Sequence, residues 1–130
     1  MTQVEVVQFW KDSSDRDWTF AQEIFAGGKR YDSALFFVHL SLEKLLKAIH
    51  YHIKNEHPLA IHDLVVLARR IGMEMDSNLE KRLKEITSFN VAARYDDYKL
   101  SFYKKATKEY ANIWIKNAKE VRDLCLKMMS

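Results

Sequence analysis

The pattern of apolar and polar positions is most informative between residues 31 and 54. At about 100° per residue, a helix over this range carries apolar side chains on nearly its whole circumference. They are Leu35, Val38, Leu42, Ile49 and Ile53 on one side and Phe37, Leu40, Ala48 and Tyr51 on others. A helix of this kind is either central in a fold or lies at a contact between subunits. We expect one of these two positions for residues 31 to 54.

Four further segments show helical spacing. They cover residues 3 to 26, which end at Gly27-Gly28; about 63 to 71, which end at Gly72; a segment that begins at the capping-box pattern Ser77-Asn78-Leu79-Glu80; and about 102 to 128. In the last segment, apolar and small polar residues alternate in steps of three and four, which is typical of a seam between packed helices. We therefore predict an all-α fold. The expected form is a five-helix antiparallel up-and-down bundle that makes one domain over residues 1 to 130.

Composition agrees with this prediction and limits the possible functions. The 130 residues include only three Gly and one Pro, whereas a sheet protein needs frequent turns. The net charge of +3 is too small to grip duplex DNA by phosphate neutralisation alone, but it permits a local anion site. The single Cys125 excludes an internal disulfide and a multi-cysteine zinc site. Because we find neither a membrane-spanning run nor a cleavable signal, we expect a cytoplasmic protein.

Polar residues form a narrow stripe on the helix predicted for residues 31 to 54. Asp32, His39, Glu43 and His50 fall within about 40° of one another on the helical wheel. Either this stripe faces water, with Glu43 and Lys47 as an ordinary pair four residues apart, or it lines a cleft. In a cleft, His39 and Glu43 would hold a ligand or move a proton. Since His39 and His50 are three turns apart and cannot share one ion, we expect no metal, and we expect no cofactor.

The segment Arg94-Tyr95-Asp96-Asp97-Tyr98 follows an apolar, helix-compatible run. An arginine forms bidentate contacts with phosphate, and a tyrosine stacks on a base. Two carboxylates next to Arg94 repel phosphate and would instead form a salt bridge with the guanidinium. Two interpretations follow: Arg94 fixes the corner between the last two helices while Tyr95 packs in the core, or Arg94 and Tyr95 bind a ligand.

His62-Asp63 also has two interpretations. Asp63 has the side chain of a helix N-cap, and His62 would then only hydrogen-bond the incoming loop. Alternatively, the pair forms a phosphate-binding position at the start of a helix.

Three segments together resemble the HEPN family, the higher eukaryotes and prokaryotes nucleotide-binding domains. "SALFFVHLSLEKLLKAIHYH" (33 to 52) resembles the family's second helix, which ends in Glu-Lys-x-x-Lys-Ala. "IHDLVVLARRIG" (61 to 72) is similar to the His-Asp-Leu that opens the next helix, and "ARYDDY" (93 to 98) stands where the family commonly has Ser-Arg-Tyr-Pro. Two positions differ, because His39 replaces a frequent Gln and Asp96 replaces the Pro.

The resemblance implies a homodimer that is encoded beside a minimal nucleotidyltransferase and binds nucleotides or nucleic acid. Many relatives are RNases that use an Arg, four to six residues, and then a His. Here Lys99, Leu100 and Ser101 occupy the positions of that His after Arg94. We therefore predict a non-nucleolytic binding module that acts with a nucleotidyltransferase, as its substrate-binding or toxin-antitoxin component, and has no membrane association.

The predicted ligand site combines the candidates above: Arg94 for the phosphate, with Tyr95, His39, Glu43, His62 and Asp63 around it. Two alternatives remain. One is an RNase whose atypical site consists of Arg94, His39 and Glu43. The other is a helical assembly domain without a small ligand.

Overall fold

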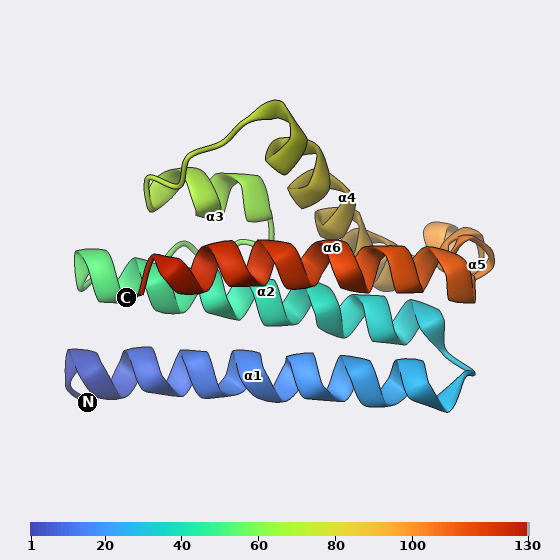
Figure 1. Ribbon diagram of the computed structural model, residues 1–130, viewed down its shortest axis with the longest axis horizontal. Coiled ribbons are helices and arrows are strands. Elements are labelled where there is room, and N and C mark those ends of the chain that lie inside the picture. Colours follow the sequence, from blue (N-terminus) through green and yellow to red (C-terminus); the bar gives the residue numbers. More distant parts are fainter. Residues whose placement is uncertain (130) are drawn as a thin grey trace.

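The computed structural model describes residues 1–129, except for the side chains of residues 93, 96 and 97. This part contains helices and no strand. The helices are α1 (Gln3–Gly27), α2 (Tyr31–Lys54), α3 (Leu64–Arg70), α4 (Ser77–Arg94), α5 (Asp96–Lys105) and α6 (Lys108–Lys127) (Figure 1). None of them combines the length and the apolar character that a membrane span requires. The all-α prediction is confirmed, but there are six helices and not five.

The additional helix lies between two chain breaks, of which the sequence indicated only the first, the corner after Arg94. Tyr95 has an extended backbone (φ −110°, ψ 123°) and ends α4, after which the chain turns into α5 at once. A second break lies at Ala106 and Thr107, inside the segment predicted as one helix. There the Thr107 hydroxyl accepts a hydrogen bond from the Tyr110 amide (3.2 Å) and begins α6.

Side chains cap most helix starts, although one cap differs from the prediction. The carboxylate of Asp76, and not the hydroxyl of Ser77, caps α4 by accepting from the Leu79 amide at 2.7 Å. Gly28, in the left-handed region at φ 73°, ends α1 as predicted. The bounds of α2 agree with the prediction at both ends, and Asn55 closes it in the left-handed region at φ 50°.

Helix α2 is the centre of the molecule. It contacts each of the five other helices, and most of its side chains between Ala34 and His50 are buried. Helix α1 packs antiparallel along one side of α2, while α6 and α4 pack elsewhere around it, and both termini lie at the same end (Figure 1). The expectation of a central position is thus confirmed. Its consequence is that α2 carries its polar stripe into the interior.

A buried arginine links three of the long helices. Arg122 of α6 is 6% exposed, and its Nη1 donates to the hydroxyl of Ser14 in α1 at 2.8 Å and to the hydroxyl of Ser41 in α2. Its Nη2 donates to the carboxylate of Asp15. The guanidinium also lies over the ring of Trp18, with 5.4 Å to the ring centroid. These contacts fix how α6 sits against α1 and α2.

Candidate phosphate-binding site

The polar stripe of α2 does not face water. His39 is completely buried, and Glu43 and His50 are 6% and 3% exposed, so the water-facing interpretation is wrong. The physical reason is the central position of α2, which other helices cover on every side. Asp32 pairs with Arg30 at the start of the helix (2.8 Å), far along the axis from Glu43. Only His39 and Glu43 of the stripe therefore belong to one site.

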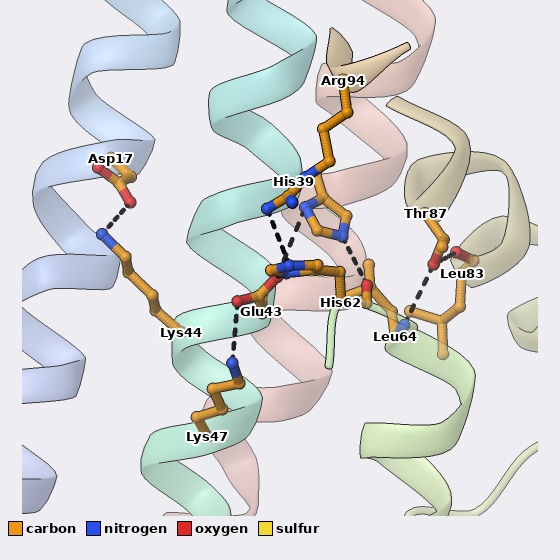
Figure 2. Close-up of polar contacts among 10 residues, drawn as sticks. All are labelled: Asp17, His39, Glu43, Lys44, Lys47, His62, Leu64, Leu83, Thr87 and Arg94. Carbon is orange, nitrogen blue, oxygen red and sulfur yellow. Dashed lines mark hydrogen bonds and ion pairs between the residues drawn. The ribbon is translucent and has the colours of Figure 1, made fainter. Parts of the chain in front are cut away.

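Glu43 is the buried end of a polar chain (Figure 2). Its Oε2 accepts from Nζ of Lys47 at 3.0 Å, which confirms that pair, and its Oε1 lies 2.7 Å from Nδ1 of His62. Burial alone would raise the pKa of Glu43, but the hydrogen bonds from His62 and Lys47 outweigh it and hold the pKa below its ordinary value. Glu43 is therefore a carboxylate and acts as an acceptor only.

The charge state of Glu43 determines the tautomer of His62. Since the carboxylate accepts, Nδ1 of His62 carries the proton and donates it. Nη2 of Arg94 lies 2.8 Å from Nε2 of the same ring, and because a guanidinium only donates, Nε2 accepts with its lone pair. The side chain of His62 is 41% exposed. Glu43, His62 and Arg94 thus form one chain that runs from the core to the surface.

His39 lies behind this chain and positions it. Its Nε2 is 2.8 Å from the carbonyl oxygen of His62, to which it donates. Its Nδ1 has no hydrogen-bond partner among the atoms that the structure describes and lies 4.0 Å from Oε1 of Glu43. Burial lowers the pKa of His39, which keeps the ring neutral. With no exposed surface, His39 holds the His62 backbone and does not reach the solvent.

A pocket of about 270 Å³ opens where the chain meets the surface. It lies between α3 and α4, and its lining residues are His62, Asp63, Thr87, Asn90, Val91, Arg94 and Tyr95. Thr87 fixes its floor, because its hydroxyl accepts from the Leu64 amide (3.1 Å) and donates to the Leu83 carbonyl (2.8 Å). These two bonds tie the first turn of α3 to the middle of α4, so the pocket has a rigid base (Figure 2).

Asn90 is a pocket residue that sequence reasoning missed. It is 2% exposed, and its Nδ2 has no hydrogen-bond partner among the described atoms. A buried amide donor without a partner is costly, so it is a group that a ligand can satisfy. Asn90 precedes Arg94 by four residues and hence shares its helix face. That spacing was visible in the sequence, but an asparagine in an apolar run gives no other signal.

Two further predicted residues, Asp63 and Tyr95, also line the pocket. The Oδ1 of Asp63 accepts from the amides of Val65 (2.9 Å) and Val66 (3.3 Å), which confirms it as the N-cap of α3. Tyr95 is 58% exposed at the rim, so the expected packing of Tyr95 in the core is wrong. The predicted salt bridge of Arg94 with Asp96 or Asp97 concerns side chains outside the described part of the chain.

Comparison with known proteins supports the earlier resemblance. The crystal structure of TT1696 from Thermus thermophilus is similar over 94% of this chain and 97% of that chain, with a TM-score of 0.79 and 16% sequence identity. At this identity the similarity concerns the fold alone. No curated protein sequence matches the chain. The sequence profile of the HEPN domain matches residues 7–128, which is nearly the whole chain, and the protein therefore belongs to the HEPN domain family.

Proposed function

We propose that the Arg94 pocket binds the phosphate of a nucleotide or of a nucleic acid, and that the protein is a binding module and not a nuclease. The observation that carries this proposal is the group of nitrogen atoms around one pocket of about 270 Å³. Arg94 supplies a permanent cation, and the buried Nδ2 of Asn90 supplies a donor that has no partner among the described atoms. Both are groups that phosphate oxygens accept from.

The carboxylates that this structure describes at the site do not oppose an anion. Glu43 is buried against Lys47 and His62, and Asp63 is engaged by two backbone amides. Arg94 needs only to exchange its bond to the neutral His62 for a bidentate bond to phosphate. With one fixed cation at the site, we expect weak binding of a mononucleotide, and binding that weakens as salt screens the charges.

Calorimetric titration with nucleoside mono- and triphosphates tests this function. Arg94→Lys keeps the charge but loses the planar fork, so we expect affinity to fall about tenfold, which is the worth of one charge-assisted bond. Asn90→Ala should weaken binding as well. The matched control is Arg69→Lys, which changes an exposed arginine that pairs with Glu80 at 2.9 Å. Equal affinity of wild type and Arg94→Lys would return Arg94 to a purely structural role.

A second candidate function, an RNase, is favoured by the orientation of His62. A histidine whose Nδ1 donates to a buried carboxylate presents Nε2 as a base, and an arginine beside it stabilises charge on phosphate. The site would then use His62 in place of the buried His39. Metal-free cleavage of RNA by the purified protein that disappears in His62→Asn would establish this function, whereas we expect no robust cleavage.

We further propose that the module is a cytoplasmic homodimer that works with a minimal nucleotidyltransferase, as its substrate-binding or toxin-antitoxin component. The family resemblance supports the partner, and the exposed aromatic residues Phe9 and Phe20 of α1, at 56% and 45% exposure, support the dimer. Co-purification of a nucleotidyltransferase encoded beside the gene tests the first part. Failure of the two purified proteins to bind each other would contradict it.

A further inference from the structure

A second hollow adjoins the Arg94 pocket on the same side of α4. It has a volume of about 460 Å³ and lies between the surfaces of α4 and α5. Thr87 and Val91 line both this hollow and the Arg94 pocket, so the two hollows are neighbours with these side chains between them. We call the second hollow the α4–α5 groove.

The walls of the α4–α5 groove suit a flat, uncharged ring. Val91 of α4 and Tyr98 of α5 are 44% and 58% exposed, while Phe102 and Ala92 form a buried apolar floor. Exposed tyrosine rings are surfaces on which nucleobases stack, independently of the base. The groove thus offers an apolar surface beside the pocket that offers phosphate donors.

Lysines stand at the outer end of the groove. Lys84 and Lys105 also line it, with side chains 66% and 51% exposed. Lys84 pairs with Glu80 at 3.5 Å and Lys105 pairs with Glu85 at 3.1 Å. Exposed pairs of this kind contribute little energy, so either ammonium can exchange its partner for a phosphate. Lys84 precedes Arg94 by ten residues of α4, which corresponds to roughly 15 Å along the helix axis.

We propose that the α4–α5 groove binds a nucleobase next to the phosphate held by Arg94, and that the ligand of the whole site is single-stranded nucleic acid. This inference rests on the proposed function of the Arg94 pocket. A mononucleotide fixed by its phosphate at Arg94 ends at Val91, and only a chain that continues places a base against Tyr98 and reaches Lys84 and Lys105. The strand must be single because a duplex hides the base faces that a tyrosine stacks on.

Titration of a mononucleotide and of a four-nucleotide RNA of the same base tests the inference. We expect the tetranucleotide to bind wild type at least tenfold more tightly than the mononucleotide. Tyr98→Ala should remove at least fivefold of this advantage, as loss of one stacking surface does, and leave mononucleotide affinity unchanged. Tyr103→Ala is the matched control, because Tyr103 is on α5 at 51% exposure but contacts Arg30 outside the groove. It should bind both ligands like wild type.

The possible outcomes distinguish failure of the α4–α5 groove from failure of the proposed phosphate binding at Arg94. Equal affinity for both ligands, or a chain-length advantage that survives Tyr98→Ala, overturns the groove while the phosphate pocket stands. Tetranucleotide binding that is unchanged in Arg94→Ala overturns the proposed pocket instead. If Tyr98→Ala changes the molecular mass in light scattering but not RNA affinity, the groove is a protein contact and the inference is wrong.

Discussion

At the scale of single residues, Glu43 determines the state of the site. It is a buried carboxylate with two hydrogen-bond donors, Lys47 and His62, and only 7% of its side chain is exposed. Transfer of such a charge out of water is expensive, and the two partners offset this cost. The bond between Nδ1 of His62 and Glu43 fixes the proton of His62 on Nδ1 and leaves Nε2 to face Arg94. One residue therefore couples stability to the chemistry of the pocket.

Removal of the Glu43 charge should destabilise the fold. Glu43→Gln leaves the ammonium of Lys47, 9% exposed, without its counterion, and we expect a loss of about 3 kcal/mol in the free energy of unfolding. Urea denaturation measures it. The control is Glu120→Gln, which removes a 70% exposed partner of Arg82 and should cost less than about 1 kcal/mol. Equal effects of the two substitutions would contradict the account of Glu43.

The lowered pKa of Glu43 gives this stabilisation a defined dependence on pH. Because its pKa in the folded protein lies below the ordinary 4.5, the stabilisation is complete above pH 4.5. It is lost as the pH falls from there through the folded value. Urea denaturation at pH values from about 3 to about 6, on both sides of the ordinary pKa of 4.5, measures this dependence. As the pH falls, the free energy of unfolding should decrease more steeply for wild type than for Glu43→Gln. Parallel curves would mean that Glu43 does not titrate in this way.

At the scale of elements, the sequence predicted α2 well and the region after α4 poorly. The limits of α2 were readable because Gly27-Gly28 precede it and Pro58 follows it. The break at Ala106 and Thr107 contains neither Gly nor Pro, and the apolar spacing continues across it. The sequence likewise did not determine whether the polar stripe with His39 and Glu43 faces water or the interior. Its burial depends on how α3 and α4 pack over α2, which is a tertiary property.

The contacts of Arg122 should make the junction of α1, α2 and α6 sensitive to substitution. Arg122→Met leaves the buried hydroxyls of Ser14 and Ser41 without their common donor, and we expect a loss of about 2–3 kcal/mol in the free energy of unfolding. Thermal and urea denaturation measure it. Lys119→Met, on the same helix and in an exposed pair with Asp123, should change it by less than about 0.5 kcal/mol. A neutral Arg122→Met would show that the network contributes specificity and not stability.

At the scale of the whole molecule, the site exists only after folding. His62 and Arg94 are 32 residues apart in the chain, and their direct bond was not deducible from either motif. The predicted set of residues nevertheless contains four that the fold brings together: His39, Glu43, His62 and Arg94. The role of His39 behind the site, the exposure of Tyr95 and the presence of Asn90 required the structure, because each depends on which helix covers which face.

The exposed aromatic face of α1 predicts a dimer. Phe9 and Phe20 are eleven residues apart and lie on one face of α1, which packs chiefly against α2. We expect light scattering to give twice the chain mass of 15.4 kDa at micromolar concentration. Phe9→Asp should shift the mass towards the monomer, whereas Ile113→Asp on the exposed side of α6 should not. A monomeric wild type would make the dimer prediction wrong.

The central claim is that Arg94 and Asn90 receive a phosphate and that Arg94 then leaves His62, and side-chain NMR of ¹⁵N-labelled protein tests it most directly. Addition of a nucleoside monophosphate should shift the Nδ2 amide signals of Asn90, the Nε signal of Arg94 and the ring nitrogens of His62. The ring nitrogens of His50, buried at the far end of α2, should not move. Unchanged signals of Asn90 and Arg94 at saturating nucleotide would contradict the account.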